Sequence, residues 1–532
     1  MGKSSAFPLI VFFTLALSGA PLPGSWQNAV PGQPRLGGTL RIKPFSKVFK
    51  PNLDPASDAP YYVLEQLYDG LVRLDGNYNV TPSLAEYWVI SGDGRKLTFT
   101  LRKGAKFHHG REVTADDVKF SLERLLRKDV GTLYYQYFVS KVVGAEAFWA
   151  GKAAEVAGFR ARDRTTFEIE WKNPYVSGLY LLSMFFCKIL PRDLVEAQGR
   201  SFFQRPSGTG AFRFGNWLRD TSLEITGVRL ERNRDYFGEI AYLDAVEYSP
   251  AFTMEQFQRG EVQIIPLESE DLASGRYQVL ENNSLDVFFL GMSCRIAPLD
   301  RKEVRQALAF ALDKRRLARA VSSISSVPQV VHNYIPAGLP GFFPLEGPER
   351  PNLTRAGVML ADAGFPEGKG FPELSLCFVL PRTRQHLRFH QELKSQLAAL
   401  GIRLELRYFR SFDELRAFGK PRLSFFEWRM DFPDAENIIL PLFSSGSPTN
   451  GLYMDYANSG LDAFLAASEV EAGWEKRTSL FRKMESVLFE DVPAVPLFQL
   501  RLRMALQPNV RGAAAPLLAF HFLDAREIWI DR

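Results

Sequence analysis

The chain of 532 residues has little cysteine, and neither sign of charge dominates it. Its three cysteines, Cys187, Cys294 and Cys377, are too few for a disulfide scaffold, and none of them forms a CxxC pair. The 65 basic and 60 acidic residues leave a net charge of +5, whereas a nucleic-acid-binding surface needs clustered basic residues. These shortages exclude a small disulfide-rich protein and predict no nucleic-acid partner.

Motifs for catalysis and metal binding are also missing. The sequence has no GxSxG, HExxH or P-loop pattern. His386 and His390 have the spacing of metal ligands on one helical face, but no acidic partner motif accompanies them, so a solvated helix is the simpler interpretation. His108-His109 fits a surface turn better than a contact with a metal chelate. We therefore predict no catalytic residue, no metal site and no cofactor.

The first twenty residues have the pattern of an export signal. Lys3 precedes the apolar run from Leu9 to Leu17, and Ser18-Gly19-Ala20 supplies the small residues that signal peptidase accepts. The run is about half of the ~20 residues that span a bilayer, and the alternatives are a buried N-terminal helix or an uncleaved anchor. No cysteine lies near the cleavage region, which disfavours a lipid anchor. We predict a signal peptide at 1–20 and a flexible linker at 21–36.

Hydrophobic periodicity predicts alternating strands and helices in the first half of the chain. Residues 97–101 alternate as a half-buried strand, and Asp93-Gly94 is typical of a hairpin turn that joins them to 87–90. Thr114 and Asp117 have capping-box spacing at the start of a helix that reaches residue 126. Gly208-Thr209-Gly210 indicates a tight turn into the next strand.

The second half has the same mixture. We predict helices at 304–320, 390–400 and 474–489, and strands at 374–380 and 402–406. Strand–helix–strand order favours a parallel pair with a right-handed crossover. A length prior gives about three or four domains, so the sequence predicts an α/β protein with several lobes.

Nine motifs occur in an order that resembles one known family. They are Leu84 to Trp88, Gly104 to Gly110, Thr114 to Arg124, Gly208 to Phe212, Glu231 to Gly238, Val304 to Leu308, Ala361 to Phe365, Trp428 to Asp434, and Pro493 to Phe498. Each motif alone is weak. The ordered set, from about Gly37 to the C-terminus, resembles the family 5 extracellular solute-binding proteins, which are the peptide-binding components of bacterial ABC importers.

The resemblance implies a two-lobed periplasmic-binding-protein-like clamp, of type II and cluster C, with an extra inserted α/β domain. Ligand would bind between the lobes, and closure would be a hinge motion. The implied segments are 37–60, 184–290 and 501–532 for lobe I, 61–183 for the extra domain, and 291–500 for lobe II.

The resemblance also implies a residue for a peptide's amine. In peptide-binding members the aspartate of a Trp-x-x-Asp motif holds the amine, and Trp428 and Asp431 match that motif. A carboxylate in a closing, water-poor cleft attracts an amine more strongly than one in bulk water. The alternatives are that Asp431 forms a turn with Pro433 or pairs with an arginine such as Arg429.

Arg429 departs from the family pattern. Oligopeptide-binding members have a cysteine after the tryptophan, bridged to a cysteine that aligns with Cys294. Arg429 makes that bridge impossible, so the three thiols are either free or one other pair joins. The charge of Arg429 puts amine recognition in doubt and suggests an acidic group on the ligand.

Other candidate ligand-binding residues follow from the same resemblance. Arg382 and Arg384 lie after the strand at 374–380, where dipeptide-binding relatives have an arginine for the peptide carboxylate. A solvated basic helix start is the alternative. Lys50 lies in the segment that relatives pair with an extended ligand backbone, although Pro51 has no N–H to donate.

Tyr134, Tyr135 and Tyr137 form an aromatic cluster with Phe138 in the extra domain. Relatives place an aromatic cleft wall there, because aromatic rings cover side chains of many shapes with little loss of rotamer freedom. Core packing explains such a cluster at least as well.

We therefore predict a periplasmic monomer that captures a peptide or peptide-like solute and delivers it to ABC permease subunits at the inner membrane. The alternative is the same clamp with another cargo, such as a nickel chelate, an oligosaccharide, haem or an opine-like acid, because fold does not set the ligand. A different class, an extracellular enzyme or a ligand-sensing regulator, lacks a catalytic motif and a leading helix-turn-helix segment.

Overall fold

The computed structural model describes residues 33–75, 79–273, 275–337, 339, 341–345, 350–379, 382–419, 422–514 and 523–531. The predicted signal peptide and residues 21–32 of the predicted linker lie outside these ranges. No helix within the described ranges has the length and apolar content that crossing a membrane requires.

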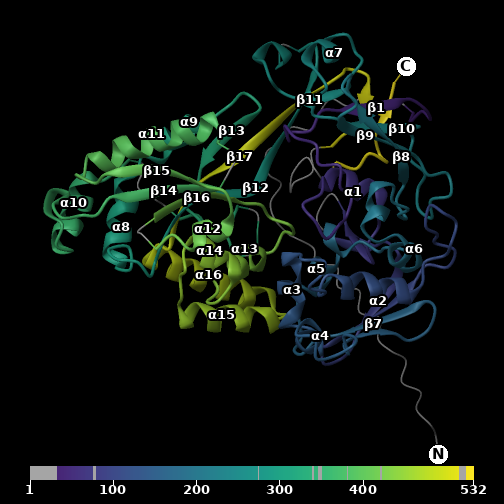
Figure 1. The fold of residues 1–532 in the computed structure, drawn as a ribbon, viewed down its shortest axis with the longest axis horizontal. Coiled ribbons are helices and arrows are strands. Elements are labelled where there is room, and N and C mark those ends of the chain that lie inside the picture. The colour runs from purple at the N-terminus through teal and green to yellow at the C-terminus, as the bar shows by residue number, and fades with distance from the viewer. Residues whose placement is uncertain are drawn as a thin grey trace, which may run out of the picture.

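A sheet of eleven strands runs through two bodies of the molecule (Figure 1). Its path is β15 (Leu404–Phe409), β14 (Leu374–Val379), β16 (Arg422–Trp428), β12 (Gln278–Met292), β17 (Ala494–Leu506), β11 (Ile264–Pro266), β1 (Thr39–Ile42), β10 (Ala245–Tyr248), β9 (Ile225–Arg232) and β8 (Phe212–Arg219), and β13 (Ser326–Val330) pairs with β17 beside it.

The long strands β12 and β17 connect the two bodies. They are antiparallel, with Gln278 opposite Leu506 at one end and Gly291 opposite Ala494 at the other. Their register is irregular between Asn283 and Val287, which is where the chain passes from one body to the other. A local break in a ladder bends the strand.

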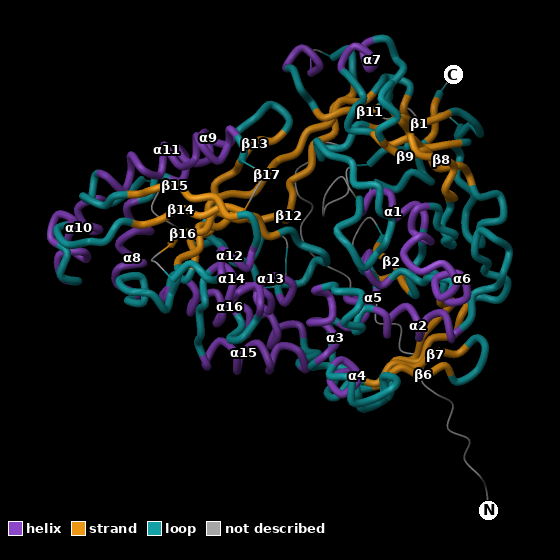
Figure 2. Tube along the Cα trace, viewed as in Figure 1, coloured by secondary structure: helices purple, strands orange, loops and turns teal. Residues whose placement is uncertain are grey.

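The body on the left of Figure 1, which we call lobe II, has helices on both faces of the sheet (Figure 2). One core packs α8 (Lys302–Ala311), α9 (Lys314–Val321), α10 (Leu353–Asp362) and α11 (Arg384–Ala398) on the sheet; the other face is covered by α12 (Phe412–Arg416), α13 (Glu436–Phe443), α14 (Pro448–Tyr453), α15 (Ser459–Val470) and α16 (Trp474–Asp491). Phe288 and Phe289 of β12 belong to different cores because successive side chains of a strand face opposite sides.

The body on the right, lobe I, holds β1 and β8 to β11, and its lower part is called the inserted domain. The inserted domain has a four-stranded antiparallel sheet of β4 (Ala85–Ile90), β5 (Lys96–Leu101), β7 (Thr166–Glu170) and β6 (Phe159–Ala161). The other elements on this side are α1 (Tyr61–Leu67), β2 (Val72–Leu74), β3 (Val80–Pro82), α2 (Ala115–Arg124), α3 (Gln136–Val139), α4 (Ala145–Trp149), α5 (Gly178–Leu182), α6 (Arg192–Gln198), α7 (Met254–Gln258), β18 (Val510–Arg511) and β19 (Trp529–Ile530).

Local sequence signals predicted several of these elements correctly. β4 and β5 form the expected hairpin, with Gly94 at a φ of 67° in its turn. Thr114 precedes α2, and the Asp117 carboxylate accepts hydrogen bonds from the Thr114 N–H and hydroxyl at 2.9 and 2.8 Å. The strand at 374–380, the helix at 474–489 and the parallel pairing of β14 with β15 are also confirmed.

Four predictions differ from the structure. Residues 304–320 form two helices, because Asp313 caps α9 by accepting a hydrogen bond from the Arg316 N–H. Helix α11 begins at Arg384, six residues before the predicted start, and β15 begins at Leu404. Gly208 and Gly210 do not have positive φ; a Cβ atom there would lie 2.0 Å from the Leu67 carbonyl oxygen and 2.2 Å from the Gln66 carbonyl oxygen. Close packing against the end of α1, and not a tight turn, explains these glycines.

The cysteines are free thiols, and His386 and His108 are held by ring stacking and by hydrogen bonds. Cys187, Cys294 and Cys377 are free, so the alternative of a joined pair is excluded. The His386 ring stacks on Phe378, with centroids 4.0 Å apart, and is therefore not simply solvated. The ring of His108 is half-buried; it accepts a hydrogen bond from the Gly208 N–H at Nδ1, so Nε2 donates to the Gly210 carbonyl. Among the described residues, no group of three or more His, Cys, Asp or Glu side chains could hold a metal ion.

Candidate functional site

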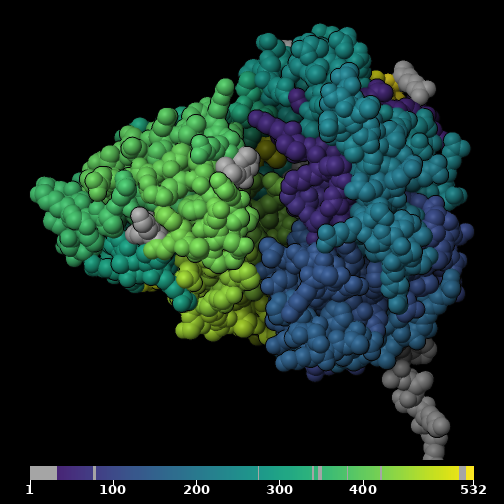
Figure 3. Space-filling view, viewed as in Figure 1, coloured from purple at the N-terminus to yellow at the C-terminus, as the bar shows by residue number. Residues whose placement is uncertain are grey.

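A hollow separates lobe II from lobe I in the space-filling view (Figure 3). Purple residues of the N-terminal part of the chain border it on one side, and green residues of lobe II border it on the other. Two further grooves lie on lobe II itself, one between α9 and α11 and one at the ends of α10 and α11. The hollow is the place between the lobes where a ligand would be enclosed on closure.

Strand ends of the large sheet position one wall of this hollow. β14 and β16 are parallel neighbours, so their carboxyl ends lie at the same edge of the sheet. Trp428, the last residue of β16, lies opposite Val287 in β12, directly beside the register break. The loop after Trp428 therefore leaves the sheet where the chain passes between the lobes.

Asn437 of α13 holds that loop in place. The Trp428 indole N–H donates to the Asn437 carbonyl at 2.9 Å, and the Asp431 backbone N–H donates to Asn437 Oδ1 at 2.8 Å. A second anchor is Asp286, whose Oδ1 accepts from the Met430 N–H at 3.3 Å. These bonds use the backbone N–H groups of Met430 and Asp431 and not the Asp431 carboxylate. Asp431 is half-buried.

Arg429 forms ion pairs with two neighbouring carboxylates of lobe II. Its Nε lies 3.6 Å from Asp286 Oδ2, and its Nη2 lies 3.3 Å from Glu427 Oε1. The Asp286 side chain is only 4% exposed, whereas the Arg429 side chain is 44% exposed. One guanidinium thus serves two carboxylates at the edge of the site.

Asp431 lies in a site that disfavours its charged form. Burial raises its pKa to about 6, although the nearby Arg429 charge acts in the opposite direction. Burial, followed by the charge of Glu427, raises the pKa of Asp286 to about 7. At both carboxyl groups, therefore, the positive charge of Arg429 does not offset the effect of burial.

Three tyrosines of lobe I and the inserted domain lie near enough to Asp431 for its charge to affect them. Burial raises the pKa of Tyr61, Tyr134 and Tyr137, and the Asp431 charge raises each of them further. Tyr134 also stacks on Phe186 with centroids 4.3 Å apart. The structure brings these rings and Asp431 together across the gap between the two bodies.

The other predicted residues lie farther from this group. Tyr135 instead stacks on Trp149 of α4, with centroids 5.1 Å apart. Lys50 forms an exposed ion pair with Asp58. The Arg382 guanidinium lies 4.8 Å from the ring centroid of Tyr408, and Arg384 is the exposed first residue of α11. Both arginines follow β14, at the same sheet edge as Trp428.

Sequence reasoning did not include four residues of the site: Tyr61, Asp286, Glu427 and Asn437. The signal that could have found Asp286 is a carboxylate inside the otherwise apolar run at 285–292. Asn437 could have been found as an amide in the apolar helix after the Trp-x-x-Asp motif.

Just beyond the loop, α13 carries a second acidic cluster that meets the inserted domain. Lys141 Nζ donates to Glu436 Oε1 at 3.0 Å and to Glu469 Oε1 at 2.6 Å. Arg477 Nη2 donates to Asp434 Oδ1 at 2.9 Å. The hydroxyl of Tyr175 and that of Ser177 complete the network, at 2.9 Å from Glu436 and 3.0 Å from Arg477. This network joins lobe II to the inserted domain.

The fold and the site define a class of two-lobed binding proteins, and comparisons with known proteins agree. The model of the bacterial extracellular solute-binding proteins, family 5, matches residues 79–450, which is more than half of the chain. The chain belongs to this family.

Named relatives show the range of the family. The chain is 24% identical to the dipeptide-binding protein of Escherichia coli, covering 86% of this chain and 88% of that one. It is 27% identical to heme-binding protein A of Haemophilus influenzae, covering 84% of each. A periplasmic oligopeptide-binding protein structure from Borrelia burgdorferi superimposes with a TM-score of 0.76 at 24% identity, over 93% of this chain and all of that one. The predicted α/β two-lobed clamp is confirmed.

Proposed function

We propose that this chain captures a peptide in the hollow between its lobes and hands it to the permease of an ABC importer, without catalysis. The family membership and the names of relatives, among them dipeptide- and glutathione-binding proteins, support this function. The same relatives support a periplasmic location, and an export signal at 1–20 would deliver the chain there. We further propose that it acts as a monomer.

The observation that carries the proposal is a shortage of cations around Asp431. Three carboxylates line this wall, those of Asp286, Glu427 and Asp431, and Arg429 pairs with the first two. Within the described residues Asp431 has no ion pair. The missing positive charge is the one that a peptide's terminal amine supplies, because a charge-assisted hydrogen bond is about twice as strong as a neutral one.

This arrangement changes the role expected of Arg429. Its sequence position suggests an acidic group on the ligand, but two carboxylates of lobe II already neutralise it. Arg429 then balances the charge of Asp286 and Glu427 and leaves Asp431 as the carboxylate that meets the ligand's amine. A free acidic group on the ligand would bind another cation, and Arg382 at the same sheet edge is the candidate. Arg384 instead lies on the exposed face of α11 with Arg388.

The aromatic side of the hollow would hold the ligand's backbone and side chains. Tyr61 and Tyr134 are half-buried and lie near Asp431 on lobe I and the inserted domain, so closure would bring them against anything bound to it; Tyr137 is buried and stacks on Phe186. We propose the lobe boundaries at the register break at 283–287 in β12, because Phe288 and Phe289 pack in the cores of lobe II, and at 500/501 in β17; the first boundary precedes the 290/291 that the resemblance implied. Paired strands that cross between lobes make a stiff hinge whose flexible point is the register break at 283–287.

Ligand carried through purification tests the proposal directly. Native mass spectrometry of the protein, followed by denaturation and sequencing of released molecules, should identify peptides. A bound haem, metal chelate, sugar or opine-like acid would overturn peptide capture and establish the alternative cargo.

Calorimetry with a defined pair of probes then tests the amine site. Tri-alanine should bind, and N-acetyl-tri-alanine, which has no terminal charge, should bind at least tenfold more weakly. Equal affinities would contradict recognition of the amine by Asp431 while leaving peptide capture standing.

A further inference from the structure

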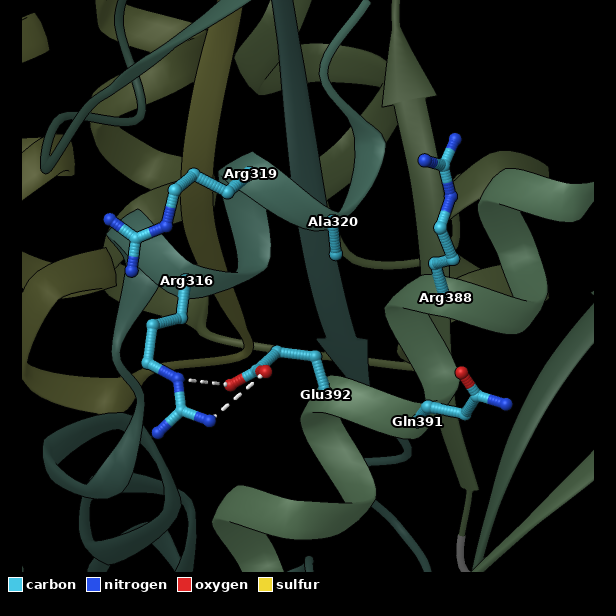
Figure 4. Close-up of a pocket in the computed structure, with 6 residues that line it drawn as sticks. All are labelled: Arg316, Arg319, Ala320, Arg388, Gln391 and Glu392. Carbon is cyan, nitrogen blue, oxygen red and sulfur yellow. Dashed lines mark hydrogen bonds and ion pairs between the residues drawn. The ribbon is translucent and has the colours of Figure 1, made fainter.

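A second feature of lobe II is an open groove of about 420 Å³ between α9 and α11. It is lined by Arg316, Arg319, Ala320, Arg388, Gln391 and Glu392 (Figure 4). The two helices lie side by side over the sheet, at the upper left of Figure 1, away from the hollow. The groove therefore has no part in the ligand site described above.

The groove is strongly basic. α9 has three exposed arginines, Arg315, Arg316 and Arg319, and no acidic residue. Glu392 is the only acidic residue in the lining, and Arg316 already covers it, with Nε 2.8 Å from Oε1 and Nη2 3.2 Å from Oε2.

The remaining arginines have no counter-charge. Among the described residues, Arg315, Arg319, Arg384 and Arg388 form no ion pair. Four exposed guanidinium groups on two adjacent helices would repel one another in the absence of an anionic partner.

The shape of the groove favours a broad partner over a small ion. In Figure 4 the guanidinium groups of Arg319 and Arg388 extend away from each other, from α9 and from α11. They do not converge on one point, as a compact phosphate site would require. A surface that carries many spaced negative charges could contact Arg319 and Arg388 at the same time.

An apolar residue shares this basic face. Leu387 is 46% exposed and lies between Arg384 and Arg388 on the outer face of α11, where positions three and four apart are neighbours. A face of arginines with an exposed leucine matches the headgroup region of an anionic bilayer, where basic residues meet phosphates and apolar side chains enter the acyl boundary.

We propose that the α9–α11 face docks on an anionic lipid bilayer. Its four arginines, without a carboxylate partner, and Leu387 bind the lipid surface. A protein that hands a solute to a membrane transporter gains from this, because binding to the membrane surface raises its concentration near the partner.

Co-sedimentation with vesicles tests the docking. The full-length protein is mixed with vesicles of 30% phosphatidylglycerol in phosphatidylcholine, and with vesicles of phosphatidylcholine alone. The wild type should bind the anionic vesicles only, and binding should fall as sodium chloride rises from 50 to 300 mM, since salt screens charges.

The double variant Arg319→Ala/Arg388→Ala should bind about 30-fold more weakly, at about fivefold for each basic residue removed. Arg205→Ala/Arg234→Ala removes the same charge from exposed positions of lobe I and should bind like the wild type. Asp431→Asn should also bind like the wild type, which separates docking from ligand capture.

Three results would overturn the proposal. One is equal losses in the two double variants, because net charge alone would then explain binding. Another is no binding of the wild type to anionic vesicles, as expected if an acidic protein were the partner. The third is complete release by 10 mM inorganic phosphate, but not by sodium chloride of equal ionic strength, which would indicate a discrete phosphate site.

Discussion

Two acidic clusters lie within a few residues of each other on lobe II, and they differ in how their charge is balanced. At the inserted domain, Asp434, Glu436 and Glu469 meet two buried cations, Lys141 and Arg477. At the hollow, Asp286, Glu427 and Asp431 have a single arginine. The first cluster, with its two cations, connects lobe II to the inserted domain, and we call it the joint. The second cluster can accept a further cation.

The pKa values of the most deeply buried carboxyl groups follow the same division, although burial raises the pKa of the less buried Glu469. Burial alone would raise the pKa of Glu436, but the charges of Lys141 and Arg477 lower it below its ordinary value. The pKa values of Asp286 and Asp431 are raised to about 7 and about 6, because burial outweighs the single arginine. Similar side chains of lobe II thus serve structure in one place and, in our proposal, binding in the other.

The largest effect is expected at the joint. Arg477→Met should lower the free energy of unfolding by about 3–5 kcal/mol, because it leaves Asp434 buried without its cation and leaves Glu436 with Lys141 alone. Urea denaturation followed by circular dichroism measures it. Arg192→Met, which breaks an exposed pair with Glu196, is the control and should cost at most about 1 kcal/mol. Equal losses would show that the joint is not a stabilising network.

At the hollow, the charge of Asp431 should affect binding instead of stability. Asp431→Asn should weaken tri-alanine binding by about 10- to 100-fold, the value of a hydrogen bond to a charged group. Isothermal titration calorimetry measures the affinity, and Asp116→Asn on the exposed start of α2 is the control. An unchanged affinity would contradict the amine site.

The affinity for tri-alanine should depend on pH. The amine needs an ionised Asp431, so affinity should fall about tenfold per pH unit below about pH 6. Titrations at pH 4.5, 5.5 and 7.5 would test this. In Asp431→Asn the slope between pH 4.5 and 6 should be lost; a slope that persists would assign the titration to another group.

Stability should respond to pH through Asp286. Its folded pKa of about 7 lies above the unfolded value near 4, so its ionisation destabilises the fold; the cost is absent below pH 4 and complete above pH 7. Asp286→Asn should therefore raise the melting temperature at pH 8 and leave it unchanged at pH 4. The same shift at both pH values would show that the effect is not linked to ionisation.

The smallest effect is expected at Glu427, the half-buried partner of Arg429. Glu427→Gln should change stability by less than about 1 kcal/mol at neutral pH. It should lower the pKa of Asp286, because the Glu427 charge is one cause of its rise. Carbon-13 NMR titration of the aspartate carboxyl groups measures this shift, and a pKa that does not move would separate Glu427 from the cluster.

Local patterns in the sequence predicted elements where the deciding groups are neighbours in the chain. The hairpin at Asp93-Gly94 and the cap at Thr114 depend on residues within a few positions, and both form as expected. The helix predicted at 304–320 was wrong because its apolar period continues across the break, and only the Asp313 cap divides it.

The residues around Asp431 depend on both a local sequence motif and tertiary contacts. The Trp-x-x-Asp motif located Trp428 and Asp431 from the sequence, but it left the role of Arg429 open. That role depends on Asp286, which lies 143 residues earlier and meets Arg429 only through the pairing of β12 with β16. The tyrosines opposite Asp431 come from still another part of the chain.

By itself, the sequence determined the class of this protein, its α/β architecture and the loop that carries Asp431, because ordered motifs and hydrophobic periods are written along the chain. Only the tertiary structure decided which charges are neutralised and which are left for a ligand. Charge balance depends on distances of a few ångströms between residues far apart in sequence, and folding alone sets those distances.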